Sequence, residues 1–543
     1  MGDASRTDNE KTVILQIAPE TGRLPRDMGP LARYISGKSG GMGEVVSALC
    51  EGLTHRGIEC HLATFNLSRR FQQENHLNDD QWRKINSTTD PDRIHLVNSA
   101  VFHDLPDAYA GNSVINAAEF QKVMVNQIIP RIRAKNGGRL IIHSHDWMAG
   151  GIITAYAKMA GCPVLHTLHN VHTGDIPFDL LFGVDTAQLS DHLYRSTAYG
   201  KPAIDSQATA VKNASLVNFV GNRFLREIVD DHFADHPIIP PSVRGEVKVK
   251  HQFGSTRAII NAPAWDMYPE RSDHLVRKYG CNDDVIAAKQ ENRVEFQKRT
   301  GLNVDPEAIL LYWPSRLDPS QKGVELLEAI AQRFVAVHPD TQIAIVGNGV
   351  GSDRGHEEIC GRIACASWGK ITYQRFSEPL SMLGFAAASD VFGASLYEPC
   401  GQIDQVGNLF GATATNRDTG GYHDKIRDLT FRDCGDPGDS GNGFLFRDYD
   451  ADGLWYGLTR AVQFHRLSPE IREGQIKRIM RETRQEHSLD KMIDRYVEAY
   501  DTLSGGMPLS TVEKTREPVF DFDDPLREKW FQCAFSWNAV GHA

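Results

Sequence analysis

The stretch Lys38-Ser-Gly-Gly-Met-Gly-Glu44 runs directly into the apolar segment 45–53, and this junction indicates the kind of fold. Glycines let a backbone approach a ligand closely, and the spacing of the apolar residues predicts a helix that starts near Gly43. The amides at the start of such a helix favour an anion, and Lys38 adds a mobile positive charge. An ordinary glycine-rich turn between a strand and a helix is the alternative, and this stretch alone does not decide between the two.

A second stretch, far along the chain, is built in the same way. Ser395-Leu-Tyr-Glu-Pro-Cys-Gly401 places a carboxylate, Glu398, beside a glycine turn, and Thr419-Gly-Gly421 follows it. Packing alone explains such a combination poorly, although a role for Glu398 as a loop or cap residue stays open. Two stretches of this kind in one chain predict a cleft between two halves of the protein.

Short β-branched runs followed by amphipathic stretches recur along the chain, which is typical of strand-helix-strand units with parallel sheets. The runs form two groups, so we predict an α/β fold with two Rossmann-like domains. Ligands of open parallel sheets bind outside the carboxyl ends of the strands. The residues after each run are therefore the candidate site. The runs are 13–18, 140–143 and 163–168 in the first half, and 309–313, 342–346 and 390–394 in the second.

Polar residues do follow these runs. Arg316 and Lys322 share one loop, where the arginine fork and the lysine charge suit a diphosphate, although a solvated loop is the alternative. The stretch Gly347-Asn-Gly-Val-Gly351 is a weak nucleotide-loop signal that gains from following a strand. Further candidates at the predicted strand ends are His145, Asp146, Trp147, His169 and Asn170.

Composition sets limits on the function. The chain has 543 residues, 41% hydrophobic and 24% charged, which suffices for two cores, and its formal charge of −11 argues against nucleic acid as a partner. Nine cysteines without a Cys-x-x-Cys pair favour reduced thiols and a cytoplasmic location. The N-terminus is too polar for a signal peptide, and no apolar run reaches the ~18 residues of a membrane span, so we expect no membrane partner.

We expect two domains and a tail. The N-terminal domain spans 1–262 and the C-terminal domain spans 263–503, because prolines and a charged helix-like run follow the boundary. The tail spans 504–543. Aromatic residues within 525–540 predict a docked helix there, with local core packing as the alternative.

These motifs resemble those of the bacterial and plant glycogen/starch synthase family, whose members are retaining glycosyltransferases with the two-Rossmann architecture called GT-B. The matches follow the family order from residue 13 to about 500. The family's Lys-Thr-Gly-Gly-Leu-x-Asp-Val corresponds to Lys38–Val45, its His-Asp-Trp corresponds to His145–Trp147, and its His-Asn corresponds to His169–Asn170. In the second half, the family's Ser-Arg-Leu…Gln-Lys-Gly corresponds to Ser315–Gly323. Its Glu-Pro-Cys-Gly and Thr-Gly-Gly correspond to the stretches that begin at Glu398 and Thr419.

The resemblance implies an enzyme that adds α-1,4-linked glucose from ADP-glucose to the non-reducing end of a glycogen- or starch-like glucan. Positive side chains and amides would stabilise the leaving diphosphate, which implies neither a metal nor a cofactor. Glu398 would act by electrostatics and positioning, without a covalent bond to the sugar. The implied catalytic residues are Glu398, His169, Lys322, Arg316 and Asp146, and the implied nucleotide-sugar contacts are Lys38, Gly40, Gly41, Arg316, Lys322, Gly347, Gly349, Cys400, Gly401, Thr419, Gly420 and Gly421.

The sequence departs from the family pattern near the expected sugar, so the reaction type is better supported than the substrate. One alternative is a related retaining transferase that uses another nucleotide sugar, such as UDP-glucose, or a small acceptor. Another is a non-catalytic glucan-binding homologue, but such a module has no need of the residues that bind a diphosphate. The departures include Met148 for His, Leu396 for Arg, Gln402 for Leu, Asp404 for Gln and Ala414 for Pro.

Overall fold

The computed structural model describes residues 12–37, 40–88, 93–234, 236, 238–349, 354–429 and 441–511, and a seven-stranded sheet forms its first half. The strands of this sheet are β1 (Val13–Ile17), β2 (Cys60–Phe65), β3 (Ile94–Val97), β4 (Leu140–His145), β5 (Val164–Leu168), β9 (Leu216–Phe219) and β10 (Thr256–Ala258). Their order is β10-β9-β5-β4-β1-β2-β3, and all neighbours are parallel. A small antiparallel sheet contains β6 (Asp175–Pro177), β7 (Arg195–Ala198) and β8 (Lys201–Asp205).

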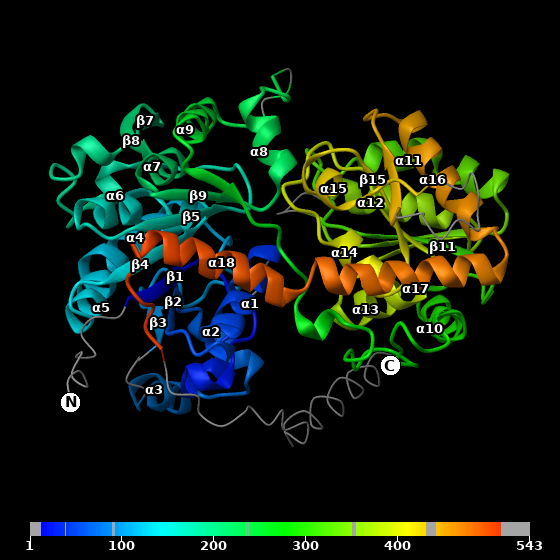
Figure 1. Ribbon diagram of the computed structural model, residues 1–543, viewed down its shortest axis with the longest axis horizontal. Helices are drawn as coiled ribbons and strands as arrows, with labels where there is room; N and C mark the ends of the chain where they lie inside the picture. The colour runs from blue at the N-terminus through cyan, green and yellow to red at the C-terminus, as the bar shows by residue number, and fades with distance from the viewer. Residues whose placement is uncertain are drawn as a thin grey trace, which may run out of the picture.

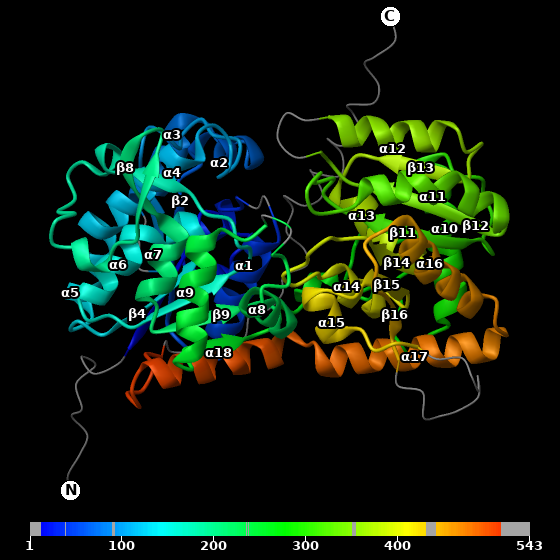
Figure 2. The ribbon, with the colours of Figure 1, turned by 90° about the horizontal axis from the view of Figure 1, so that it is seen from above.

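A second parallel sheet forms the other half. Its strands are β11 (Ile309–Pro314), β12 (Thr341–Val346), β13 (Ile371–Gln374), β14 (Asp390–Gly393), β15 (Thr413–Arg417) and β16 (Gly443–Phe446), in the order β13-β12-β11-β14-β15-β16. Figures 1 and 2 show the two sheets beside each other, each with helices packed against it. The predicted α/β fold with two parallel sheets is confirmed.

Helices alternate with the strands in both halves. The first half has α1 (Gly41–His55), α2 (Ser68–Glu74), α3 (Asp79–Thr88), α4 (Ser113–Val123), α5 (Ile129–Lys135), α6 (Gly151–Met159), α7 (Ser206–Asn213), α8 (Asn222–Val229) and α9 (Pro241–Gln252). The second has α10 (Val285–Thr300), α11 (Val324–Val337), α12 (Gly355–Cys365), α13 (Glu378–Ala387), α14 (Ile403–Leu409), α15 (Gly420–Lys425), α16 (Ala451–His465) and α17 (Pro469–Glu486), and α18 (Leu489–Leu503) follows.

Local chemistry explains why these segments adopt their structure. All five residues of β1, Val-Ile-Leu-Gln-Ile, are buried, as expected of a parallel strand covered on both faces. Helix α10 begins where the Asp284 carboxylate accepts a hydrogen bond from the Ala287 amide at 3.1 Å. It ends at Gly301, whose φ of 77° suits glycine and closes the helix.

Helix α18 returns to the first half, and this corrects the predicted domain limits. Figure 1 shows α17 along the second half and α18 along the first. The apolar face of α18, including Leu489, Ile493 and Tyr500, is buried in the first core, where α18 contacts α1 and β5. The prediction that residues 263–503 form one domain is therefore wrong for 489–503. An amphipathic pattern shows that a helix has a buried face but does not show which sheet covers it.

The boundary near residue 262 stays a prediction. Ala262 packs in the first core and Tyr268 in the second. Residues 509 and 511 make isolated bridges with Thr12 and Ile58, so the chain ends its described course beside β1. The predicted docked helix within 525–540 lies outside the described residues.

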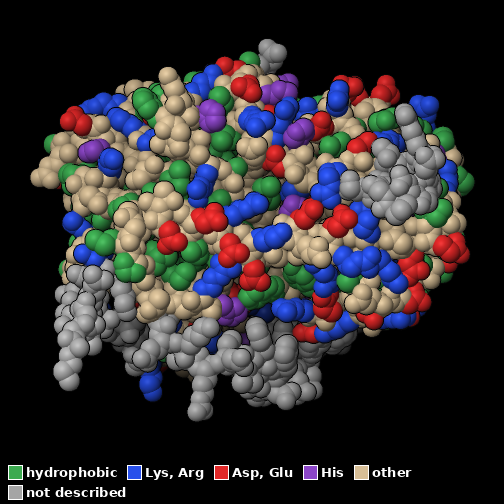
Figure 3. All heavy atoms as spheres, viewed as in Figure 1, with side chains coloured by type: hydrophobic (Ala, Val, Ile, Leu, Met, Phe, Trp, Pro, Cys, Tyr) green, Lys and Arg blue, Asp and Glu red, His purple; other side chains and the backbone are tan. Residues whose placement is uncertain are grey.

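Charged side chains of both signs cover the face seen in Figure 3. On α17 they form a network in which Glu482 accepts bonds from Arg427 at 3.1 Å and from Arg478 at 2.8 Å. Among the described residues, no helix combines the length and the apolar character needed to cross a bilayer.

Candidate active site

An ion pair lies at the carboxyl ends of β11 and β14. The Lys322 Nζ and the Glu398 Oε2 are 2.5 Å apart, and both side chains are largely buried, with 13% and 10% of their surface exposed. The Ser395 hydroxyl donates to the same carboxylate oxygen at 2.9 Å. Between the two loops, the Leu396 amide donates to the Gln321 carbonyl at 2.7 Å. The structure thus brings together the two charged residues that the sequence placed in separate motifs.

A second pair of predicted residues meets at the ends of β4 and β5. The Asp146 carboxylate accepts hydrogen bonds from the backbone amides of His169, at 2.7 Å, and Asn170, at 3.2 Å. Burial raises the pKa of Asp146 to about 7, the two amides oppose this shift, and the negative charge of Glu20 adds to it. The φ of Asp146 is 55°, a left-handed conformation that non-glycine residues adopt at a cost.

The His169 ring is held from inside the sheet. Its Nε2 lies 2.9 Å from the Nδ1 of His145. Burial, with a smaller contribution from His166, lowers the pKa of His169 to about 3. His169 is therefore a neutral hydrogen-bonding group at neutral pH.

Tyr397 joins the two halves of the site. It is the neighbour of Glu398, yet its ring packs in the core of the first half, 6.5 Å from the ring of Phe224 and 6.2 Å from that of Phe233. Burial raises the pKa of Tyr397 to about 12, and a hydrogen bond from the side chain of Asn170 opposes the shift. This contact fixes the Glu398 loop beside the end of β5, next to His169.

Arg316 is exposed, and its charge acts across the halves. Burial lowers the pKa of His172, Asp318 opposes this shift, and Arg316 lowers the pKa further. Arg316 also acts on Tyr109, whose hydroxyl donates to Glu20 at 3.2 Å. The charge of Arg316 thus acts on two residues of the first half, His172 and Tyr109.

The first glycine stretch lies close to a buried carboxylate, Glu20, that none of the sequence motifs includes. The Gly40 amide donates to Glu20 Oε2 at 2.8 Å, and Gly41 begins α1. Gly41 also faces the second half, because a Cβ there would lie 3.9 Å from the Gln402 side chain. Glu20 lies just beyond the end of β1, so its place at a strand end is the signal that would have found it. Lys38 lies outside the described residues.

The Thr419-Gly-Gly421 turn packs against the Glu398 loop. The Gly421 amide donates to the Glu398 carbonyl at 2.9 Å. The Gly420 amide and the Thr419 hydroxyl donate to the carboxylate of Glu227, on α8 of the first half, at 3.1 and 3.2 Å. A Cβ on either glycine would clash with the backbone of residues 398–400. This packing is a reason for both glycines, and their contact with a donor stays a prediction.

The remaining predicted residues support the same loops. Cys400 is buried, and Gly401 has a φ of 63° where a Cβ would meet the Tyr422 ring. A Cβ on Gly347 would clash with the Ser315 carbonyl, and the Gly349 amide donates to Glu357 at 2.8 Å. Gly347 therefore packs against the loop that carries Arg316, and Gly349 forms an isolated bridge with Leu317 of the same loop.

Asp404, one of the residues that depart from the family pattern, forms an ion pair with Lys425. The Asp404 carboxylate lies 2.7 Å from the Lys425 Nζ, and both side chains are almost fully buried. Burial raises the pKa of Asp404 to about 6, and the charge of Lys425 opposes this shift. The pair ties α14 to α15 and does not interrupt the candidate site.

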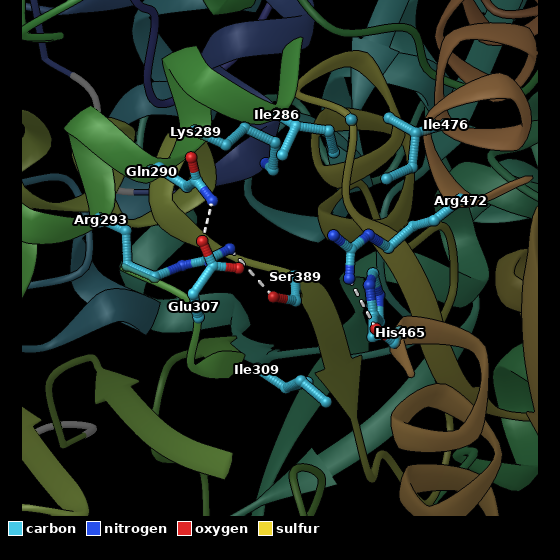
Figure 4. A pocket seen from close by; sticks show the side chains of 11 residues that line it. Ile286, Lys289, Gln290, Arg293, Glu307, Ile309, Ser389, His465, Arg472 and Ile476 are labelled. Atoms are coloured by element: carbon cyan, nitrogen blue, oxygen red, sulfur yellow. Dashed lines mark hydrogen bonds between the residues drawn. The ribbon is translucent and has the colours of Figure 1, made fainter. Parts of the chain in front are cut away.

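A separate pocket, shown in Figure 4, lies at the opposite ends of the strands of the second sheet, beside Ile309 and Ser389. The buried Lys289 and Arg293 side chains that line it donate hydrogen bonds to backbone carbonyls. The Lys289 Nζ donates to the Phe410 carbonyl at 2.8 Å, and the Arg293 Nε donates to the Ala387 carbonyl at 2.9 Å. These carbonyls lie at the ends of α14 and α13, where positive charge is stabilising. The pocket is distinct from the candidate active site.

Comparisons with known proteins identify similar sequences. The family model described as the starch synthase catalytic domain matches residues 30–237. The glycogen synthase of Clostridium botulinum (strain Alaska E43 / Type E3) is 24% identical over 495 residues, which cover 86% of this chain and 97% of that protein. The glycogen synthase of Moorella thermoacetica is 25% identical over 502 residues, covering 87% and 93%.

Solved structures share the fold. The catalytic domain of starch synthase IV from Arabidopsis thaliana, bound to ADP and acarbose, superposes with a TM-score of 0.71 at 19% identity, covering 91% of this chain and 100% of that one. Sucrose-phosphate synthase from Thermosynechococcus elongatus gives 0.53 at 15% identity, covering 91% and 100%. With its two parallel sheets, the chain shares the GT-B fold of these structures, and over most of its length its sequence is similar to proteins named glycogen synthase.

Proposed function

We propose that this chain is a retaining glucosyltransferase that moves glucose from ADP-glucose to the non-reducing end of an α-1,4-glucan. The observation that carries the proposal is the place of the Lys322–Glu398 pair, which Tyr397 fixes beside the strand end bearing His169 and Asp146. A positive group, a carboxylate and a neutral hydrogen-bonding ring then surround one site between the two sheets.

Arg316 and Lys322 bind the diphosphate of the donor in this proposal. Arg316 offers a planar fork of N–H donors, and Lys322 offers a point charge that is already balanced by Glu398. Both groups stabilise the negative charge that grows on the leaving diphosphate. The predicted contribution of Lys38, Gly40 and Gly41 is part of the same proposal.

The sugar lies toward Glu398, His169 and Asp146. Positive charge develops at the anomeric carbon in the transition state, and the Glu398 carboxylate stabilises it. The neutral His169 hydrogen-bonds a sugar hydroxyl, while Asp146 fixes the backbone that carries His169. The bond from the anomeric carbon to the diphosphate oxygen breaks, and the acceptor oxygen bonds to that carbon on the same face. The acceptor hydroxyl passes its proton to a phosphate oxygen.

The choice of donor and acceptor rests on the relatives. The chain is similar over most of its length to proteins named glycogen synthase, and the starch synthase IV structure contains ADP and acarbose. Leu396 and Gln402 differ from the family pattern near the expected sugar, which is the observation that keeps UDP-glucose as a second candidate donor.

A donor panel tests the proposal. Purified protein is incubated with ADP-glucose, UDP-glucose or GDP-mannose, each with and without glycogen, and the released nucleoside diphosphate is measured. We expect ADP release from ADP-glucose that depends on glycogen. Release from UDP-glucose alone would establish the second donor, and release from no donor with any acceptor would indicate a non-catalytic homologue.

A further inference from the structure

An unbroken path of hydrogen bonds connects His169, at the candidate active site, with Tyr500 on α18. The His169 Nε2 lies 2.9 Å from the His145 Nδ1, and the His145 Nε2 lies 2.8 Å from the Gln16 Oε1. The Gln16 Nε2 donates to the Tyr500 hydroxyl at 2.8 Å. The path crosses β5, β4 and β1 and reaches a helix at the far end of the chain.

The path continues beyond Tyr500. The tyrosine hydroxyl lies 2.7 Å from the His143 Nδ1, and the His143 Nε2 lies 2.7 Å from the Thr167 hydroxyl. Gln16, His143, His145 and Tyr500 have no exposed surface. Burial lowers the pKa of both histidines well below its ordinary value, so both rings are neutral. Each neutral ring has one donor nitrogen and one acceptor nitrogen.

This rule, together with the orientation of the Gln16 amide, whose nitrogen faces Tyr500 and whose oxygen faces His145, sets the direction of every bond. The Tyr500 oxygen accepts from the Gln16 amide, so its hydroxyl hydrogen is free to donate to the His143 Nδ1. The Gln16 Oε1 is an acceptor, so the His145 Nε2 carries the hydrogen and its Nδ1 is bare. The His169 Nε2 must then donate to His145. The Nδ1 of His169 is left as the hydrogen-bond acceptor of that ring.

We propose that Tyr500 is a positioning residue for the transfer reaction: acting through Gln16 and His145, it fixes the ring and the tautomer of His169. The consequence for catalysis rests on the proposed function, in which His169 accepts a hydrogen bond from the sugar. Removal of the Tyr500 hydroxyl frees the Gln16 amide to rotate, because its nitrogen no longer has a buried acceptor. Either tautomer of His145 and His169 then satisfies the remaining bonds.

The same geometry gives α18 a role in the site. The helix packs on α1 and β5, and Tyr500 is the residue through which it bonds to Gln16 and His143 of the sheet. The return of α18 to the first half therefore joins the C-terminal part of the chain to the sugar side of the site.

Tyr496 provides a matched control on the same helix. Its ring is buried 6.3 Å from that of Tyr500, and its hydroxyl is bonded by the side chain of Asn218 at 3.1 Å. It does not lie between His169 and Tyr500. Tyr500→Phe and Tyr496→Phe each remove one buried hydroxyl, so we expect similar losses of thermal stability, and only Tyr500→Phe interrupts the path.

The test combines spectroscopy with kinetics. In protein labelled with ¹⁵N-histidine, with the His169 signals assigned through His169→Gln, we expect the hydrogen on Nε2 in the wild type and in Tyr496→Phe. We expect a mixture of tautomers in Tyr500→Phe. With ADP-glucose and glycogen, Tyr500→Phe should lower kcat by roughly tenfold with little change in donor KM, whereas Tyr496→Phe should keep kcat within about twofold.

Two results would overturn this inference: a His169 spectrum that is the same in Tyr500→Phe and the wild type, or equal losses of kcat in the two variants. The spectroscopic arm separates it from the proposed function. If the wild type is inactive with every donor, the glucosyltransferase proposal is contradicted. If the His169 tautomer nevertheless changes in Tyr500→Phe, the inference that Tyr500 fixes this tautomer still holds.

Discussion

Lys322 and Glu398 lie 2.5 Å apart, yet they have different tasks in the proposed function, and variants of the two residues should separate these tasks. Lys322→Ala removes a positive charge that, in the proposed function, binds the diphosphate of the donor, so both kcat and the affinity for ADP should fall. Glu398→Gln keeps the size of the side chain and an acceptor for the Ser395 hydroxyl, so the affinity for ADP should change little. Its kcat should fall by roughly a hundredfold or more, because the charge that stabilises the transition state is lost.

Initial rates and calorimetric titration with ADP measure these effects. Lys201→Ala serves as the control, because its ion pair with Asp179 is exposed and should affect neither quantity. Equal losses of ADP affinity in Lys322→Ala and Glu398→Gln would contradict the division of tasks.

The buried carboxyl of Asp390 should make the unfolding free energy of the protein depend on pH. Burial raises the pKa of this carboxyl from 3.8 to about 7, and its Oδ1 accepts the Thr413 hydroxyl at 2.6 Å. A raised pKa means that the folded state holds the proton more tightly, so this stabilisation is full below pH 3.8 and is lost as the pH rises through 7. Asp390→Asn does not titrate and should gain ~2–3 kcal/mol relative to the wild type between pH 5 and pH 8.

Urea unfolding of both proteins at several pH values measures this difference. Other buried carboxyls with raised pKa values, such as Asp146, are present in both proteins and cancel. A difference in unfolding free energy that does not change with pH would show that Asp390 does not carry this proton.

At the scale of elements, the packing of α18 on α1 is the least expected feature and can be tested directly. A Cβ on Gly52 of α1 would overlap the side chain of Ile493 on α18. Gly52→Ala should therefore cost ~1–3 kcal/mol in the wild type. In an Ile493→Ala background, the added methyl fills space that the isoleucine left, and the cost should disappear.

Denaturant unfolding of the four proteins in this cycle gives the coupling between the two sites. Gly474→Ala on α17 is the control, because a Cβ there meets open space and should stabilise the helix by ~1 kcal/mol. Additive effects of Gly52→Ala and Ile493→Ala would mean that the two helices do not pack as described.

At the scale of the whole molecule, features with a strong local sequence pattern, namely the two sheets and the residues at their strand ends, could be predicted from the sequence. The two sheets follow from continuous apolar runs such as β1 and β11, and strand ends pointed to Glu398, His169 and Asp146. Contacts between distant segments have no such pattern. Tyr397 is next to a recognised motif, but nothing in its neighbours shows that it packs with Phe224. Glycine has the same sequence signature whether its amide binds a ligand or its missing Cβ permits packing, so the roles of Gly420 and Gly421 needed the structure.

In the proposed function, one site between the two sheets holds both the pyrophosphate and the glucose of the donor. A crystal structure of Glu398→Gln with ADP-glucose tests it most directly. We expect the pyrophosphate within hydrogen-bond distance of Arg316 and Lys322, with the glucose beside His169 and the substituted side chain at position 398. A donor bound elsewhere, for instance in the pocket beside Lys289 and Arg293, or a pyrophosphate distant from Arg316 and Lys322, would contradict it.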